Sequence, residues 1–351
     1  MANINFFWIK KTVLSYVLAF LVLIIHISAL SNYTSVVNGD SFMQPWRWFV
    51  VSVCRCAVPT FFVLSAAVYF RDYDNSKYIL KLKKMFATLI IPYLSWNSIW
   101  MIFGFVSTIY LSKYFIGRNP SDISINGALL SILHWKDNLP FWFVFNLIVY
   151  RFFSPFLYLL LRNKIVGIVA IAITILITSI GYGLPRSVFY MSESIIYYMV
   201  GAYIGIHHFE WFVTENNYKT CVSLVIVALC IVLRMCFPID AENLLIWNRS
   251  GFYGVVGLSI FSIAVCFAFD AFSYPKKLPQ FFSHSFWVYA MHLNLSSCIC
   301  KLLYLTFPKT ILFAWINFFI TIILTLSLIE LTAVMLRRYW PYMYKVLGGG
   351  R

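Results

Sequence analysis

The sequence predicts an all-α integral membrane protein with about ten transmembrane helices and both termini in the cytoplasm. First, 62% of the 351 residues are hydrophobic and only 11% are charged, whereas soluble domains carry about 25% charged residues. Second, the mean hydropathy is +0.82, and apolar stretches of about 17–25 residues, long enough to cross a bilayer, recur along the chain. Third, lysine and arginine are distributed unevenly between alternate connecting segments.

The apolar stretches are continuous, which favours helices over the alternating ten-residue strands of a barrel. They extend far beyond the N-terminus, so a removable signal peptide does not account for them. With neither a linker nor an internal repeat between them, residues 1–351 form a single predicted membrane domain. The predicted spans are 12–31, 49–70, 86–111, 141–161, 164–181, 189–206, 219–237, 251–270, 284–305 and 311–335.

Two connections are informative. Only Arg162, Asn163 and Lys164 separate the fourth and fifth spans, so these spans should form a tight helical hairpin. The longest loop, about 112–140, is too short and too apolar to be a separate soluble domain.

The orientation follows from the tendency of basic residues to remain in the cytoplasm. If the N-terminus is inside, the inner segments carry sixteen basic residues and the outer segments carry seven. The inner set is Lys10, Lys11, Arg71, Lys77, Lys81, Lys83, Lys84, Arg162, Lys164, Lys219, Lys276, Lys277, Arg337, Arg338, Lys345 and Arg351. The outer set is Arg47, Lys113, Arg118, Lys136, Arg186, Arg249 and Lys309.

The net charge of +15 is therefore mostly a feature of the inner face. It is explained either by topology and attraction to anionic lipid headgroups or by an anionic cytosolic ligand. Nothing indicates a nucleic-acid partner. The eight cysteines lie in or beside the spans without metal-binding spacing, so we expect no metal site.

Arginine inside a span is costly, and Arg55 and Arg151 are two such residues. Arg151 lies near the middle of its span, with Asn146 and Pro155 about one turn away on either side. We expect a polar interior or a water-filled cavity there.

His26 and Arg55 lie about five and six residues from the outer ends of the first two spans. Both would then be about 7–9 Å below the outer surface, in one layer. Histidine is the usual general base and arginine the usual fixed positive charge for an oxyanion, so a shared pocket is one interpretation. A structural hydrogen-bonded pair is the other.

His292 lies about eight residues from the inner end of the ninth span, one turn after Tyr289 and close to Asn294. This depth places it too near the cytoplasm to share a layer with His26 unless helices are broken. It belongs either to a hydrogen-bonding cluster or to a ligand contact.

Four segments together resemble the membrane-bound acyltransferase-3 family. The segment "YVLAFLVLIIHIS" resembles the family's first span, which ends in histidine, and "CRCAVPTFFVLSAAVYF" resembles its pattern R-x-x-V-P-x-F-F-x-x-S-G. The segment "LPFWFVFNLIVYRFFSP" resembles the pattern W-F-x-x-x-L-I, and "HSFWVYAMHLNL" resembles S-x-x-I-Y-x-x-H. The closing "GGGR" is also similar to tails in this family. The likeness covers most of the chain.

The resemblance implies acyl transfer from a cytosolic acyl-CoA, with acetyl-CoA the expected donor, to a hydroxyl of a cell-surface or lipid-linked glycan. It implies a multi-pass protein of the bacterial cytoplasmic (inner) membrane, in contact with lipids. By the match, His26 is the catalytic histidine and Arg55 the second-span arginine. We expect substrate contacts from Trp142, Asn146, Arg151, Tyr289 and His292. The donor phosphates should contact Lys77, Lys81, Lys83 and Lys84.

The sequence departs from the family pattern in three places. Ser15 occupies the position, eleven before the histidine, where the family has arginine or lysine, and Ser65-Ala66 replaces Ser-Gly. An acidic residue near the start of the first span is missing. Two alternatives therefore stay open: a glycan exporter or flippase, and a non-catalytic subunit of a surface-polysaccharide assembly.

Overall fold

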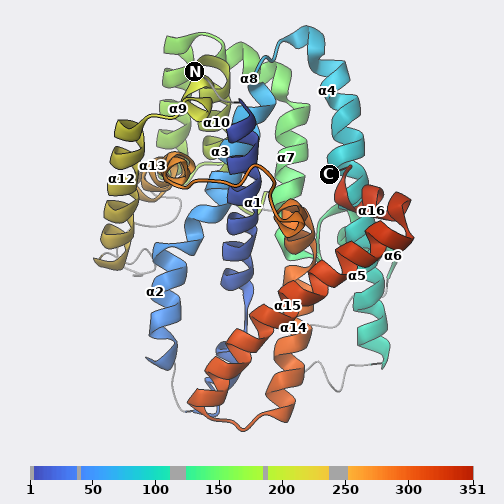
Figure 1. Cartoon of the computed structure of the whole chain (residues 1–351). Coiled ribbons are helices and arrows are strands. Elements are labelled where there is room, and N and C mark those ends of the chain that lie inside the picture. The colour runs from blue at the N-terminus through green and yellow to red at the C-terminus, as the bar shows by residue number, and fades with distance from the viewer. Residues whose placement is uncertain (1–3, 38–40, 111–123, 185–188, 237–251, 351) are drawn as a thin grey trace. The chain divides into compact units, whose positions relative to one another are not determined.

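The computed structural model describes residues 4–37, 41–110, 124–184, 189–236 and 252–350. Four predicted outer basic residues (Lys113, Arg118, Arg186 and Arg249) and the terminal Arg351 lie outside these ranges. Within them the chain is helical and contains no strand, which confirms the all-α prediction (Figure 1). The α-helices are α1 (Ile4–His26), α2 (Gln44–Ser52), α3 (Ala57–Phe70), α4 (Tyr78–Met85), α5 (Ile91–Tyr110), α6 (Ile125–Leu133), α7 (Trp142–Phe152), α8 (Ser154–Leu161), α9 (Lys164–Ser179), α10 (Ser194–His207), α11 (Glu210–Val213), α12 (Asn217–Cys236), α13 (Phe252–Ala268), α14 (Ser285–Thr306), α15 (Ile311–Tyr339) and α16 (Pro341–Gly348).

Short helical turns connect several of these helices. The 3₁₀ turns are η1 (Ser31–Tyr33), η2 (Ser41–Met43), η3 (Cys54–Cys56), η4 (Asn75–Lys77), η6 (Leu139–Phe141), η7 (Phe269–Ala271) and η8 (Gln280–His284), and η5 (Phe86–Ile90) is a π-turn.

Seven described segments are long and apolar enough to cross a membrane. The pair Leu139–Phe152 and Ser154–Leu161, which is bent by 67°, would make an eighth as one broken span. Two shorter apolar helices, Lys164–Ser179 and Ser194–His207, coincide with the fifth and sixth predicted spans. The structure therefore supports a multi-pass membrane protein, and the count of ten stays a prediction.

Apolar side chains on the outside of the helices agree with a lipid environment. On α9 alone, Ile165, Val166, Ile168, Val169 and Ile173 are exposed. Soluble monomers rarely expose so large a contiguous apolar surface. The helix boundaries also match the predicted hairpin, because α8 ends at Leu161 and α9 begins at Lys164, where the Asn163 side chain accepts hydrogen bonds from the first backbone N–H groups.

Two predicted spans are broken beside their arginines. Pro59 and Pro155 each follow an in-span arginine, Arg55 and Arg151, by four residues. A proline has no N–H to donate to the carbonyl four residues earlier, so it is tolerated only in the first turn of a helix. Accordingly α3 begins at Ala57 and α8 at Ser154, and the helix breaks next to each arginine.

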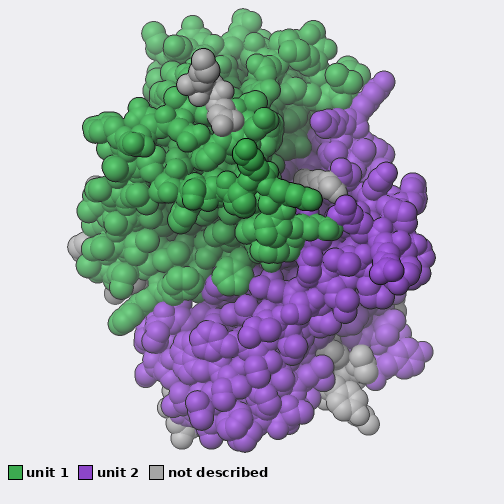
Figure 2. All heavy atoms as spheres, viewed as in Figure 1, with its two compact units in different colours: residues 1–21, 48–82, 149–282 green, residues 22–47, 83–148, 283–351 purple. Residues whose placement is uncertain are grey.

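Two compact units make up the chain, each assembled from three segments (Figure 2). Unit 1 contains residues 1–21, 48–82 and 149–282, and unit 2 contains residues 22–47, 83–148 and 283–351.

The core of unit 1 is the close contact between α3 and α10. A Cβ atom added at Gly201 would lie 2.2 Å from the Val63 carbonyl oxygen, and one added at Gly205 would lie 2.5 Å from that of Ala67. These glycines, one helical turn apart, let the two backbones approach in the way that small residues do in membrane helix pairs.

In unit 2, α14 packs against α15, and α16 packs against both α15 and α5. The indole of Trp96 donates to the Leu347 carbonyl at 3.0 Å and that of Trp100 to the Ala290 carbonyl at 2.9 Å. These two hydrogen bonds fix α16 and α14 on α5, which holds the histidine-bearing part of α14 in place.

Candidate functional site

A pair of histidines forms the centre of the candidate site in unit 2. His26 is the last residue of α1, and His292 lies on α14. Their ring centroids are 5.3 Å apart. His292 is fully buried, whereas His26 is half-buried. A substrate group could therefore reach His26 more easily than His292.

The hydrogen bonds of His292 indicate its tautomer. Its Nδ1 lies 2.8 Å from the Tyr289 carbonyl oxygen and 3.2 Å from that of Val288. A carbonyl only accepts, so Nδ1 carries the proton and donates. Nε2 is then an acceptor, and among the described residues it has no hydrogen-bond partner. A buried polar atom left in this state costs about 1–3 kcal/mol, which a bound hydroxyl donor would recover.

The prediction that His292 is too deep to share a layer with His26 held only for unbroken helices, and it is wrong because the first helix ends early. It assumed a first helix that continues to residue 31, but α1 ends at His26. The chain then follows α14 further, and the ring of Tyr33 lies 5.0 Å from that of Tyr304. Tyr304 is twelve residues beyond His292, about 18 Å along the helix. His26 therefore lies deeper than predicted, beside His292.

Tyr289 lies one turn before His292 and is buried with it. Its hydroxyl donates to the Pro140 carbonyl, and its ring lies 5.7 Å from that of Phe141 and 5.6 Å from that of Phe143. Tyr289 is therefore held by the start of α7, the helix that also carries the buried Trp142 and Asn146. Substrate contact by these residues stays a prediction.

Two residues hold the His292 part of α14: Asn294, which the sequence placed close to His292, and Trp100, which the sequence analysis did not identify. The Asn294 side chain donates to the Asp137 carbonyl at 3.0 Å, and Trp100 holds the Ala290 carbonyl on the same helix. Both fix α14 around His292. The sequence offered no signal for Trp100, because it acts on a backbone carbonyl and depends on a contact between distant segments.

Arg55 belongs to unit 1, in the 3₁₀ turn η3 between α2 and α3. Its side chain is half-buried and engaged in interactions with its surroundings. His26 belongs to unit 2, so the shared layer of His26 and Arg55 stays a prediction.

Arg151, the other predicted arginine, lies next to a predicted donor-binding lysine. Its guanidinium carbon is 5.0 Å from the centre of the Tyr69 ring, and the Lys81 ammonium is 4.8 Å from the same ring. Lys81 also donates to the Tyr69 carbonyl. The sequence placed these two cations in separate predicted roles, whereas the structure gathers them around one tyrosine.

The other three lysines differ in their surroundings. Lys77 lies 3.4 Å from the Asp74 carboxylate and donates to the Asp72 carbonyl at 2.8 Å. Hydrogen bonds from Ser76 and the nearby Lys77 lower the pKa of the Asp74 carboxyl. Lys83 and Lys84 belong to unit 2 and are exposed. Their contact with donor phosphates stays a prediction.

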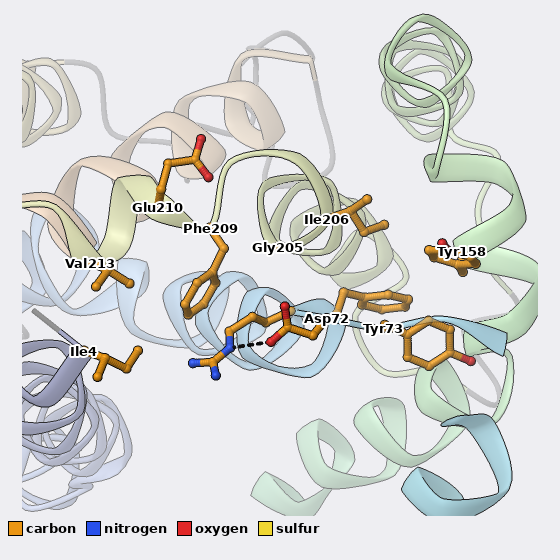
Figure 3. A pocket seen from close by; sticks show the side chains of 11 residues that line it. Ile4, Asp72, Tyr73, Tyr158, Gly205, Ile206, Phe209, Glu210 and Val213 are labelled. Carbon is orange, nitrogen blue, oxygen red and sulfur yellow. Dashed lines mark hydrogen bonds and ion pairs between the residues drawn. The ribbon is translucent and has the colours of Figure 1, made fainter. Parts of the chain in front are cut away.

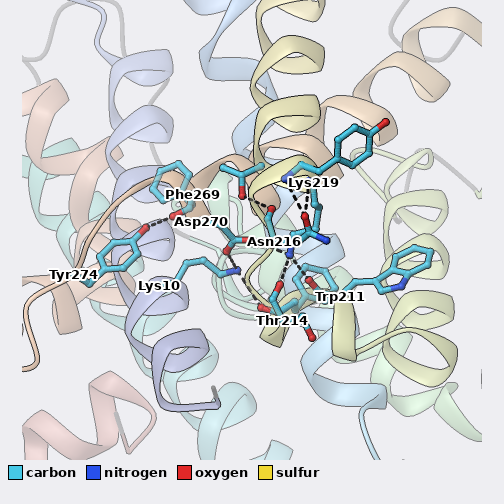
Figure 4. Close-up of polar contacts among 11 residues, drawn as sticks. Lys10, Trp211, Thr214, Asn216, Lys219, Phe269, Asp270 and Tyr274 are labelled. Carbon is cyan, nitrogen blue, oxygen red and sulfur yellow. Dashed lines mark hydrogen bonds and ion pairs between the residues drawn. The ribbon is translucent and has the colours of Figure 1, made fainter. Parts of the chain in front are cut away.

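An ion network in unit 1 corrects the expectation for Lys10 (Figure 4). Lys10 was predicted to precede the first span, but α1 begins at Ile4 and the side chain is only 2% exposed. It donates to the Asp270 carboxylate and, at 3.1 Å, to the Phe212 carbonyl. Lys219 lies 2.8 Å from the other Asp270 oxygen and donates to the Trp211 and Thr214 carbonyls.

Comparison with known families agrees with this picture. Residues 13–333, nearly the whole chain, match the family model described as "Acyltransferase domain" of the acyltransferase-3 type. The chain belongs to this acyltransferase family. No curated protein and no solved structure matches significantly.

As a member of the acyltransferase-3 family, the chain has the catalytic class that the four sequence segments suggested. Two of those segments, ending at or containing His26 and His292, supply the histidine pair. The family's basic position is occupied here by the half-buried Ser15 on α1.

Proposed function

We propose that this acyltransferase transfers an acetyl group from cytosolic acetyl-CoA to a hydroxyl of a cell-surface or lipid-linked glycan. It would do so in the bacterial inner membrane, with about ten spans and both termini in the cytoplasm. The observation that carries the proposal is the histidine pair in a membrane acyltransferase, with His26 accessible and the acceptor nitrogen of His292 buried and unsatisfied.

In the proposed reaction, neutral His26 accepts the proton of the glycan hydroxyl. The oxygen attacks the thioester carbonyl, forming a tetrahedral oxyanion that a fixed positive charge would stabilise, a role we assign to Arg55. The carbon–sulfur bond then breaks, and the CoA thiolate recovers the proton from the His26 imidazolium. Atoms and charge balance without a metal or a redox partner. His292 would orient the incoming hydroxyl or the His26 ring.

The test uses membranes that contain the full chain, with labelled acetyl-CoA as donor and mass spectrometry of the cell-surface glycans. A general base contributes about 10²–10⁴-fold, so His26→Ala and His26→Gln should both lose activity by that factor while accumulating normally. His134→Gln is the matched control, because this half-buried histidine stacks on Trp135 at 4.0 Å.

Three outcomes would overturn the assignment at different levels. A His26→Gln enzyme with most of its activity would remove the general base. Wild-type membranes that export glycan without acetylating it would replace the acyltransferase with an exporter. Glycan acetylation that persists without this chain would leave it as a non-catalytic subunit.

A further inference from the structure

A pocket of about 600 Å³ opens in unit 1 where α3 ends (Figure 3). It is lined by the segment from Phe70 to Tyr73, by Tyr158 of α8, and by residues at the end of α10 and in α11. Its volume is in the range of pockets that hold small organic ligands. The predicted orientation places this end of α3 at the cytoplasmic side.

Aromatic side chains form the walls of the pocket. The rings of Tyr73 and Tyr158 are 5.2 Å apart, and Phe70 and Phe209 also line it. Tyr73 is buried, and its hydroxyl bonds to Ser154 at 3.1 Å. Its burial raises the pKa of the phenol, which therefore stays neutral. A planar, uncharged ring system would find stacking partners here.

The polar lining suits a neutral ligand with both donors and acceptors. The Arg71 guanidinium lies 5.2 Å from the Phe209 ring, and its Nε donates to the Asp72 carboxylate at 3.0 Å. Its Nη1 is buried without a hydrogen-bond partner among the described residues. Asp72 and Glu210 also line the pocket, so their carboxylates offset the charge of Arg71 and disfavour phosphates inside it.

Asp72 holds an unusual backbone conformation at this position. Its φ is 53°, in the left-handed region that residues with a Cβ seldom adopt. The Asp72 carboxylate accepts the hydrogen bond from Arg71 while both residues line the pocket (Figure 3).

Two of the lysines predicted for donor binding flank the pocket. Lys77 donates to the carbonyl of Asp72, and the ammonium of Lys81 lies 5.2 Å from the centre of the Tyr73 ring. Both residues that they contact line the pocket. A ligand with an aromatic base inside would therefore have cations beside the pocket for its phosphates.

We propose that this pocket binds the adenine base of the acyl-CoA donor, with the ribose 3′-phosphate and the diphosphate outside it and directed toward Lys77 and Lys81. The inference rests on the proposed function, because it names the part of the donor that this region recognises. Stacking on aromatic side chains would supply the affinity, and the carboxylates would accept hydrogen bonds from the amino group of the adenine.

The test compares two donors with purified full-length protein: acetyl-CoA, and acetyl-pantetheine, which lacks the nucleotide. Tyr158→Leu removes an aromatic ring from the wall of the pocket. The Tyr158 hydroxyl has no hydrogen bond among the described residues, so the substitution breaks none. It should raise the KM for acetyl-CoA about tenfold. The kcat/KM for acetyl-pantetheine should not change. Arg71→Gln is a second variant with the same expected selectivity. Tyr203→Leu is the control, because Tyr203 is half-buried in α10 and does not line the pocket.

The result that overturns the inference is an equal effect of Tyr158→Leu on both donors, or no effect on either, in an active enzyme. Wild type that uses acetyl-pantetheine as efficiently as acetyl-CoA would overturn it as well. A measurement of CoA binding, with the shift in melting temperature as the signal, tests the pocket separately from the proposed reaction. CoA binding that Tyr158→Leu weakens, in a protein that transfers no acetyl group, would keep the pocket and remove the proposed reaction.

Discussion

The ion network of unit 1 and the histidine pair of unit 2 are both polar groups buried in apolar surroundings, but they are satisfied differently. Asp270 lies between two ammonium groups, and Lys10 and Lys219 also donate to backbone carbonyls. In the histidine pair, Nε2 of His292 has no partner among the described residues. A carboxylate that is paired with two ammonium groups links the segments that carry them, whereas a neutral nitrogen without a partner is available to a ligand.

An unsatisfied atom does not mark a site by itself, because Nε2 of the buried His284 also has no partner among the described residues. His292 differs because its ring lies 5.3 Å from that of the half-buried His26.

The largest expected loss of stability comes from removing the charge of the carboxylate that Lys10 and Lys219 share. Asp270→Asn would leave Lys10 buried without a counter-charge. Breaking a buried pair in this way costs about 3–5 kcal/mol, and we expect that loss in the free energy of unfolding. The measurement is denaturation of the purified protein in detergent, with tryptophan fluorescence as the signal.

An exposed pair is the control for this experiment. The side chains of Lys77 and Asp74, which form an ion pair, are 47% and 44% exposed. Lys77→Gln should therefore lower the free energy of unfolding by no more than about 1 kcal/mol. A double variant, Lys10→Met with Asp270→Leu, should regain most of the stability lost in Asp270→Asn. If Asp270→Asn unfolded no more easily than Lys77→Gln, the network would not be a structural link.

The second prediction asks whether unit 1 depends on packing as well as on charges. Gly201→Ala would place a Cβ 2.2 Å from the Val63 carbonyl oxygen, and neither backbone can move away without separating α3 from α10. Overpacking of this kind costs about 1–3 kcal/mol. The same denaturation measurement gives the value.

Gly257→Ala is the matched substitution, because Gly257 lies within α13 and an added Cβ would meet nothing within 4 Å. Alanine favours a helix over glycine by about 0.8–1.0 kcal/mol, so this variant should be as stable as the wild type or more so. Equal destabilisation by both substitutions would contradict the close approach of α3 and α10.

The sequence predicted the helices better than it predicted their contacts. Hydrophobic runs and the short connection at residues 162–164 located helix boundaries. The breaks beside Arg55 and Arg151, which Pro59 and Pro155 explain, were not part of the predicted spans 49–70 and 141–161. The pairing of His26 with His292 was not predictable from counting residues. Depth was measured from an assumed helix end, and the chain after His26 follows α14 instead of reaching the surface directly. Contacts such as Lys10 with Asp270 join residues far apart in sequence, which composition and spacing do not encode.

The smallest loss of stability should come from replacing His292 in the histidine pair. His292→Gln removes an imidazole whose Nε2 has no partner and whose Nδ1 bonds only to carbonyls of its own helix. The free energy of unfolding should therefore change by less than about 1 kcal/mol, since little net hydrogen bonding is lost. The rate of acetyl transfer should nevertheless fall about tenfold, which corresponds to one hydrogen bond of roughly 1.4 kcal/mol to the reacting hydroxyl.

His284 is the matched comparison because it is equally buried, immediately precedes α14 and also has an Nε2 without a partner among the described residues. Its Nδ1, however, lies 2.7 Å from the Glu330 carboxylate. His284→Gln should lose more stability than His292→Gln and less activity. The two variants thus separate a histidine that links helices from one that acts on the substrate. If His292→Gln lowered stability as much as His284→Gln and left acetyl transfer unchanged, the unsatisfied nitrogen would have no ligand, and His26 would act without it.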